Sequence, residues 1–438
     1  MANWNSWMMR AVPGTAAFLL VFSFGCQAKR VAPATQPTAI DFTAPLPEGQ
    51  MALQKISPGE YPDFSKALGR MNTADLKRAV NNSLAYLARR SSQKKYPYLD
   101  IDHARAVASL RAFSALLDSG VLSQSPAEFN QEIADTFEVY RSIGAPSPNG
   151  SGYTGKVLFT GYFTPTYDAS LTRGGSYQWP IYKRPADLVS DESGDVAHKS
   201  MPDGTLAPYP DRKEVESGLL AGQELARVTS RWNAYVITVQ GSARLRLPDG
   251  RILEVGYAGS NGREYVSPGQ QMVADGVISR RDLSFETMRR YFAEHPEAMD
   301  KYLWLNPRTV FFANRPGGPF GSLNVPVTAF ATIATDKAVY PPAMVAFLSV
   351  PIPAASAGMM PQGNGSASME NNYSGFMLDQ DRGGAIRSAG RTDIYMGIGQ
   401  SAEQVSGHQL DAGSLYYIAV KPGLMEKYSG RIASGGID

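Results

Sequence analysis

The stretch Ala243-Arg-Leu-Arg-Leu-Pro-Asp-Gly-Arg-Ile-Leu-Glu-Val255 contains two short runs typical of β-strands, separated by a turn. The turn is Pro248-Asp249-Gly250, and an Asp-Gly pair tolerates the positive φ that a tight hairpin needs. We therefore predict a β-hairpin. Similar runs, broken by Gly, Pro and Asn, recur through the rest of the chain and indicate a mainly β protein. The predicted strands are 156–163, 234–239, 243–247, 251–255, 325–334, 344–350, 375–378, 392–396 and 415–420.

Helical spacing of apolar residues marks the N-terminal part instead. Thr73 is the predicted N-cap of the second helix there. Helices followed by many short strands favour an α+β fold with β-barrel cores. A chain of 438 residues also exceeds the usual size of a single core, so we expect two domains or one inserted into another. The predicted helices cover residues 65–68, 73–89, 104–117, 127–143 and 279–295.

The first residues have the features of a targeting segment. Arg10 precedes an apolar stretch over 11–24, which is too short and too interrupted for a membrane span. The stretch ends at Ser23-Phe-Gly-Cys26, which resembles the lipidation signal of bacterial lipoproteins, with Cys26 as the lipidated residue. A plain signal peptide with an incidental cysteine is the alternative. Residues 27–60 are rich in Pro, Ala and Thr and predict a flexible tether.

Composition excludes several classes of function. A net charge of +2, without dense basic clusters, argues against nucleic-acid binding. Four scattered His residues and one Cys argue against a metal site or a Cys nucleophile. No phosphate-binding loop or serine-hydrolase elbow occurs in the sequence. The 22 Tyr and 5 Trp residues either fill strands and core or offer stacking surfaces for sugar rings. Carboxylates remain as the catalytic candidates.

The densest group of such residues lies near the C-terminus, in Asp379-Gln-Asp-Arg-Gly-Gly-Ala-Ile386 and Arg391-Thr-Asp-Ile-Tyr395. Gly383-Gly384 lets the backbone bend or approach a ligand directly after Asp381. A partly buried Asp at this junction would have a raised pKa and could act as a general acid. On local evidence alone, Asp381 and Asp393 could equally cap turns.

Ordered motifs connect these segments to a known family. Ala334-Thr-Asp-Lys-Ala-Val-Tyr-Pro341, Gln380-Asp-Arg-Gly-Gly-Ala-Ile386 and Thr392-Asp-Ile-Tyr395 resemble the three-aspartate (3D) module of the membrane-bound lytic murein transglycosylase A family. The resemblance spans roughly residues 150–425. The chain departs from the family pattern at Ala243, Pro342 and Ala343, where the family has Gly, Leu and Gly; these changes bear on loop geometry, while the aspartates are kept. Further agreement comes from Thr160-Gly-Tyr-Phe-Thr-Pro165, Val239-Gln-Gly-Ser-Ala-Arg244, Asp249-Gly250, Gly256-Tyr-Ala-Gly-Ser-Asn-Gly262 and Gly321-Ser-Leu-Asn-Val-Pro-Val-Thr328.

The resemblance implies a double-psi β-barrel domain with a second β-barrel domain inserted into it and a glycan groove between them. The barrel domain, with the N-terminal helices, would comprise residues 61–164 and 311–438, and its three-aspartate module about 325–425. The inserted β domain would comprise residues 165–310. Residues 1–26 would be the lipoprotein signal peptide, and 27–60 the tether.

The resemblance also implies an activity, a lytic transglycosylase of peptidoglycan turnover that needs no cofactor. The enzyme would cleave the β-1,4 bond between N-acetylmuramic acid and N-acetylglucosamine without water and leave a 1,6-anhydromuramic acid end. Asp381 would be the catalytic acid and base, supported by Asp336 and Asp393. The predicted substrate contacts are Tyr162, Thr164, Gln240, Ser242, Tyr257 and Asn261.

Two other functions stay open. An inverting hydrolase would need a base about 6.5–9.5 Å from the acid to activate water, and Asp393 or Asp336 could serve. A catalytically inert peptidoglycan-binding lipoprotein is the other alternative. In each case the expected partners are peptidoglycan glycan strands and, through Cys26, the outer membrane at its periplasmic face. We expect a monomer, with complexes with other cell-wall enzymes left open.

Overall fold

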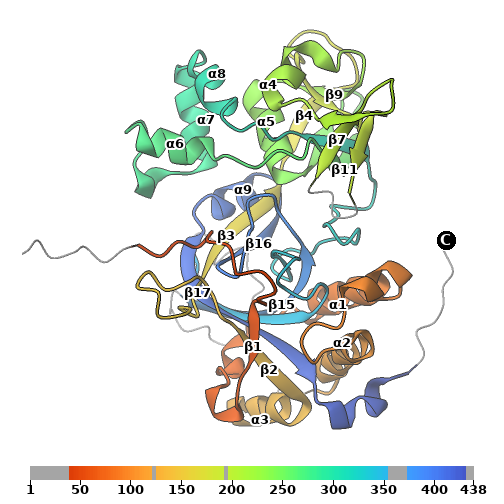
Figure 1. The fold of residues 1–438 in the computed structure, drawn as a ribbon, viewed down its shortest axis with the longest axis vertical. Coiled ribbons are helices and arrows are strands. Elements are labelled where there is room, and N and C mark those ends of the chain that lie inside the picture. Colours follow the sequence, from red (N-terminus) through yellow and green to blue (C-terminus); the bar gives the residue numbers. More distant parts are fainter. Residues whose placement is uncertain (1–38, 121–124, 192–195, 354–371, 431–438) are drawn as a thin grey trace, which may run out of the picture. The chain divides into compact units, whose positions relative to one another are not determined.

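The computed structural model describes residues 39–120, 125–191, 196–353 and 372–430. The described part of the chain is a mixed α+β protein with three β-sheets and several helices, as the sequence predicted (Figure 1). None of the helices in these ranges has the length and hydropathy needed to cross a membrane.

The largest sheet closes on itself. Its eight strands follow the order β1-β2-β17-β14-β15-β13-β16-β3, and β17 pairs with β3 as well as with β14. Six strands therefore form a ring, in which β13 runs parallel to β15 and β16 parallel to β3. The strands are β1 (Leu53–Lys55), β2 (Phe137–Ser142), β3 (Val157–Thr164), β13 (Thr332–Ala334), β14 (Val345–Pro351), β15 (Asn372–Asp381), β16 (Arg391–Ile398) and β17 (Leu410–Val420).

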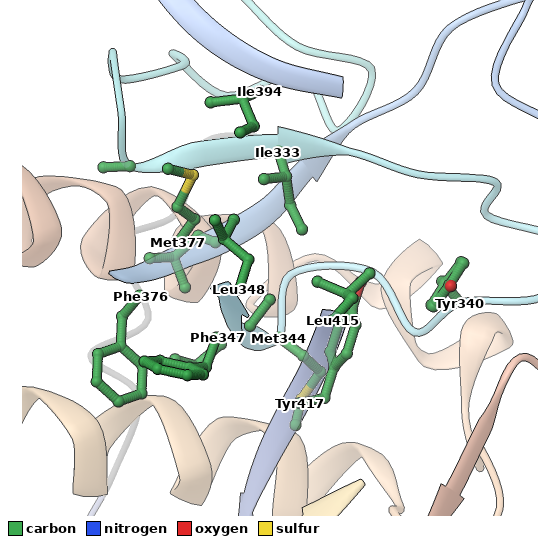
Figure 2. Packing of buried hydrophobic residues seen from close by; sticks show 14 of the residues in the cluster. Ile333, Tyr340, Met344, Phe347, Leu348, Phe376, Met377, Ile394, Leu415 and Tyr417 are labelled. Atoms are coloured by element: carbon green, nitrogen blue, oxygen red, sulfur yellow. The ribbon is translucent and has the colours of Figure 1, made fainter. Parts of the chain in front are cut away.

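Helices α1 (Thr73–Leu87), α2 (His103–Asp118) and α3 (Pro126–Thr136) pack beside the ring (Figure 1). Strands β14 and β15 are buried on both faces, because one face lines the ring interior and the other meets these helices. Figure 2 shows Phe347 and Phe376 on the helix side and Leu348 on the side of Ile333. The Phe347 and Phe376 rings lie 5.0 Å apart.

Two details of the predicted helices are wrong. The second helix is capped by Asn72, whose side chain accepts a hydrogen bond from the Asp75 amide, rather than by Thr73. The fourth ends at Thr136 instead of residue 143. Residues 137–142 include Phe137, Val139 and Tyr140, which favour strands, and they pair with β17 and β1 as strand β2.

The segment between β3 and β13 forms a second sheet of six strands. The chain passes from β3 through Pro165 into β4, and the sheet follows the order β12-β11-β10-β4-β9-β5. A single parallel bridge from Lys183 to Phe312 brings its two edges together. A separate three-stranded sheet contains β6 (Leu188–Ser190), β7 (Ala197–Ser200) and β8 (Leu206–Pro208). The six strands are β4 (Thr166–Ser170), β5 (Trp179–Tyr182), β9 (Glu224–Val228), β10 (Ser242–Arg246), β11 (Ile252–Ser260) and β12 (Val310–Asn314).

The hairpin predicted at Pro248-Asp249-Gly250 is confirmed. Strands β10 and β11 pair antiparallel up to Arg246 and Ile252, and Gly250 has a φ of 83°. The other helices of this segment are α4 (Arg212–Glu214), α5 (Arg231–Gln240), α6 (Pro268–Ala274), α7 (Phe285–Glu294) and α8 (Ala298–Leu303).

Helix α5 corrects the strand predicted over 234–239. The Ser230 side chain caps its N-terminus, and Gly241 ends it in the left-handed conformation. Trp232, one turn before Val236 on the same face, packs on the rings of Phe285 and Phe292. Caps and tertiary packing thus override the β preference of a Val- and Ile-rich run.

The predicted tether over 27–60 overlaps the folded part of the chain. Residues Leu53–Lys55 form β1, which pairs with β2, and Ala52, Leu53 and Ile56 are buried, so the folded part starts before residue 60. Cys26 and the predicted signal peptide lie outside the described residues.

Candidate active site

A cavity of about 470 Å³ lies where the closed ring meets the segment between β3 and β13, which we call the inserted segment. Its walls come from β3, the turn after β13, the loop between β15 and β16, the end of α5 and the segment from Arg308 to Val327. All three predicted aspartates, Asp336, Asp381 and Asp393, line it.

Asp381 is the last residue of β15, and its carboxylate receives three hydrogen bonds. The amides of Ser322 (2.7 Å) and Arg382 (2.8 Å) donate to Oδ1, and the Tyr162 hydroxyl donates to Oδ2 at 2.9 Å. Burial raises the pKa of Asp381, and these donors, together with the charge of Lys337, offset part of that rise. Asp381 can therefore stay protonated at a higher pH than an ordinary Asp, and the hydrogen bonds still stabilise its ionised form.

Two glycines make room around this carboxyl group. A Cβ at Gly321 would lie 3.1 Å from the Asp381 carboxyl carbon and 2.7 Å from the Gln380 carbonyl oxygen. A Cβ at Gly384 would lie 2.9 Å from Nε of Arg308, which comes from the inserted segment. Gly384, the second glycine after Asp381, thus allows the Arg308 side chain to approach the backbone closely.

The other two aspartates are held by the surrounding loops. The carboxylate of Asp336 accepts the Ala338 amide on one oxygen (3.0 Å) and the Ser388 amide on the other (2.8 Å). It thereby joins the turn after β13 to the loop that follows Asp381. On β16, Asp393 accepts a hydrogen bond from the Thr160 hydroxyl and lies 3.6 Å from Nε of Arg391.

Five of the six predicted substrate contacts line the cavity: Tyr162, Thr164, Gln240, Ser242 and Tyr257. The hydroxyl of Thr164 lies 3.1 Å from that of Ser242 and 3.0 Å from that of Tyr395. The side-chain oxygen of Gln240 accepts a hydrogen bond from the Phe163 amide at 3.0 Å. The NH₂ group of the same side chain remains as a donor for other groups. Tyr257 is the most open of these side chains, at 36% exposure.

Asn261 does not belong to the cavity, so its prediction as a substrate contact is corrected. The residue is 1% exposed. Its side-chain NH₂ donates to the carbonyls of Pro210 (3.0 Å) and Pro307 (2.8 Å), and its oxygen accepts the Thr309 amide (3.0 Å). An amide used in this way on both ends holds loops together and has little capacity left for a ligand.

Sequence reasoning missed a buried ion pair next to the site. Asp379 is fully buried and pairs with Lys337, whose side chain reaches the cavity wall. The hydroxyls of Thr335 and Tyr417 each donate to the same Asp379 oxygen at 2.8 Å. A signal existed, because the apolar run over 375–378 leads directly into Asp379, and a buried carboxylate requires a cationic partner.

Comparison with known proteins agrees with this geometry. Residues 158–313 match the MltA specific insert domain, and residues 331–419 match the 3D domain. The membrane-bound lytic murein transglycosylase A of Escherichia coli K12 is 31% identical over 299 residues, which cover 66% of this chain and 72% of that protein. The chain belongs to this family.

Solved structures of the family share the fold. A membrane-bound lytic murein transglycosylase from Agrobacterium tumefaciens superposes with a TM-score of 0.65 at 22% identity, covering 86% of this chain and 99% of that one. The E. coli MltA structure with bound chitohexaose gives a TM-score of 0.61 at 25% identity, with coverage of 88% and 98%. The family resemblance that the sequence motifs indicated is thereby confirmed.

Proposed function

We propose that this chain is a lytic transglycosylase that cleaves peptidoglycan between N-acetylmuramic acid and N-acetylglucosamine, with Asp381 as its single acid and base. Its relatives are named lytic murein transglycosylases, and one family structure holds a chitin hexasaccharide. The observation that carries the proposal is the Asp381 carboxyl group. It faces a cavity, has a raised pKa and is hydrogen-bonded on both oxygens by neutral donors.

A single carboxyl group suffices because the substrate supplies the nucleophile. Protonated Asp381 donates its proton to the glycosidic oxygen as the bond from that oxygen to the muramyl C1 breaks. The carboxylate then takes the proton of the muramyl C6 hydroxyl while the C6 oxygen bonds to C1. No water enters, and Asp381 ends protonated again. Acid and base help of this kind contributes about 10²–10⁴-fold, so positioning of the sugar must supply much of the remainder.

Hydrolysis would require a second carboxylate that accepts a proton from water. The carboxylates of Asp336 and Asp393 both bond to other groups of the protein. Each oxygen of Asp336 accepts a backbone amide, and Asp393 accepts the Thr160 hydroxyl beside the Arg391 guanidinium. Both side chains therefore hold segments of the protein in place around Asp381. We assign both residues to supporting the site, and Tyr162, Thr164, Gln240, Ser242 and Tyr257 to sugar contacts.

We further propose that the six-stranded ring is a double-psi β-barrel. The barrel domain then comprises residues 61–164 and 311–438, together with strand β1. Residues 165–310 form the inserted domain. Lipidation of Cys26 would anchor a monomer at the periplasmic face of the outer membrane, where peptidoglycan strands and other cell-wall enzymes are within reach. The relatives are named as membrane-bound, which supports an anchor.

Digestion of purified sacculi tests the catalytic assignment. The chain lacking residues 1–26 is compared with its Asp381→Asn variant, and Asp249→Asn, in an exposed turn away from the cavity, serves as the matched control. We expect digestion by the parent and the control and a loss of about 10²-fold or more in Asp381→Asn. Equal digestion by Asp381→Asn would refute the assignment. If the folded parent binds sacculi without digesting them, the chain is a glycan-binding lipoprotein instead.

A further inference from the structure

The charge lining the cavity is unlike that of the whole chain. The chain has 42 Lys and Arg against 40 Asp and Glu residues, which nearly cancel. Among the described residues that line the cavity, eight are Lys or Arg and three are Asp. One of the three aspartates, Asp381, is protonated when it acts as the acid. The side chains that line the cavity therefore include more cations than anions.

Arg212, Lys337 and Arg391 are held by partners within the protein. Arg212 is 2% exposed and donates to the Asn306 carbonyl and the Thr238 hydroxyl. Lys337 is paired with Asp379, and Arg391 lies beside Asp393 and donates to the Ala385 carbonyl. Internal partners of this kind explain why a fold keeps a cation, and these three do not by themselves indicate a ligand.

Lys95 and Arg315 are different. Lys95, at the end of the 3-10 helix over Arg90–Lys95, is exposed at the cavity wall. The guanidinium of Arg315, just after β12, donates to the neutral Asn324 side chain. Within the described part of the chain neither forms an ion pair, although both line the cavity. Arg308, Arg382 and Arg387 also line the cavity and have partners within the protein.

We infer that the cavity selects glycans that carry carboxylates on the C3 substituent of the muramyl residue, and that Lys95 and Arg315 contribute to that selection. The inference rests on the proposed function, because it takes the occupant to be a peptidoglycan strand. In such a strand the lactyl group carries a free carboxylate when the peptide is absent, and peptide carboxylates when it is present. A chitin strand carries neither.

Attraction between these charges has measurable properties. Arg binds carboxylates through a planar fork of donors, while Lys acts as a point charge on a flexible stem. Each solvent-accessible pair should change affinity by about two- to fivefold, and dissolved salt should weaken the effect because the screening length falls to about 3 Å at 1 M. Neutral sugars should bind with little dependence on salt.

A binding experiment on the Asp381→Asn variant, which cannot turn substrate over, tests this selection. The ligands are an alternating hexasaccharide of N-acetylglucosamine and N-acetylmuramic acid with free lactyl carboxylates, and the same hexasaccharide with those carboxyl groups capped as methylamides. Chitohexaose is the neutral reference, and a hexasaccharide with stem peptides is the fourth ligand. Calorimetric titrations are run at low and high salt.

We expect the free carboxylate form to bind about tenfold more tightly than the capped form at low salt, and the difference to disappear at high salt. Lys95→Gln and Arg315→Gln should each reduce the difference by about two- to fivefold, whereas Lys95→Arg should retain it. Arg251→Gln, which removes an equal charge from an exposed hairpin, should leave it unchanged. Tighter binding of the peptide-bearing form would assign the contact to stem carboxylates, and tighter binding of the peptide-free form to the lactyl group.

Equal affinity for the free and capped forms would overturn the inference, as would a difference that Lys95→Gln and Arg315→Gln leave intact. These outcomes are separate from failure of the proposed function. If the parent chain cleaves sacculi but the Asp381→Asn variant binds the two hexasaccharides equally, only the selectivity is wrong. If the Asp381→Asn variant prefers the free carboxylate form but the parent chain does not cleave sacculi, only the activity is wrong.

Discussion

Two carboxylates lie two residues apart at the end of β15, in different surroundings. Asp379 is fully buried, and it is paired with Lys337 and hydrogen-bonded by Thr335 and Tyr417. Asp381 faces the cavity and receives hydrogen bonds from Tyr162 and two backbone amides. Burial raises the pKa of both groups.

The difference lies in what each carboxylate can do with its proton. The Asp379 carboxylate is enclosed by protein groups, and the Lys337 ammonium stabilises it in the charged form. Asp381 is hydrogen-bonded by neutral donors beside the cavity, so a substrate oxygen can reach it. The same residue type on one strand thus serves structure at one position and chemistry at the other.

Removing the cation next to Asp379 should have the largest effect on folding. Lys337→Met leaves a buried carboxylate without its partner, and breaking a buried pair in this way typically costs about 3–5 kcal/mol. We expect the free energy of unfolding to fall by that amount in chemical denaturation monitored by circular dichroism. The double variant Lys337→Met/Asp379→Leu should recover most of the loss, since both charges are then absent. If the double variant were as unstable as the single one, the ion pair would not be the cause.

Removing one donor from Asp381 should shift the pH dependence of activity. Activity requires the protonated carboxyl group, so it should fall as pH rises past the pKa of Asp381. The Tyr162 hydroxyl donates to the carboxylate and lowers that pKa. Tyr162→Phe should therefore move the falling limb of kcat/KM to higher pH, by about one unit.

The control for this shift is Tyr395→Phe. The Tyr395 ring lies 5.1 Å from that of Tyr162, but its hydroxyl bonds to Thr164. We expect its pH limb to move less than that of Tyr162→Phe. A Tyr162→Phe limb that stayed in place or moved to lower pH would contradict the role given to this hydrogen bond.

Asp336 should show a smaller effect of a structural kind. Asp336→Asn keeps one oxygen for the Ala338 amide and replaces the acceptor of the Ser388 amide with a donor, a loss comparable to that of a helix cap. We expect unfolding free energy to fall by about 0.5–2 kcal/mol, measured by thermal denaturation, with the pH limb of activity unmoved. A loss of activity as deep as that of Asp381→Asn, in a folded variant, would show that Asp336 takes part in the chemistry.

The sequence predicted much of this site because its features are local. The Asp-Gly turn at 249–250 marks a hairpin, and the motifs around Asp336, Asp381 and Asp393 identify residues that the fold brings to one cavity. Interactions between distant segments were harder to predict. Lys337 and Asp379 are 42 residues apart in sequence, and the sequence around either residue does not indicate its partner.

The wrong predictions have a similar cause. Residues 234–239 have a β-favouring composition, and their helix depends on Ser230, Gly241 and packing against α7. The amide of Asn261 is used by backbone groups at Pro210, Pro307 and Thr309, which only the folded chain brings together. The close approach of Arg308 to Gly384 likewise joins the inserted segment to the loop after Asp381.

Mass spectrometry of the muropeptides released from sacculi, by the chain lacking residues 1–26, tests the central claim most directly. Intramolecular attack by the C6 hydroxyl incorporates no water. We therefore predict products that end in 1,6-anhydromuramic acid, lighter by one water molecule than the corresponding hydrolysis products. Products with reducing muramic acid ends would show that water is the nucleophile, and they would contradict the single-carboxyl mechanism assigned to Asp381.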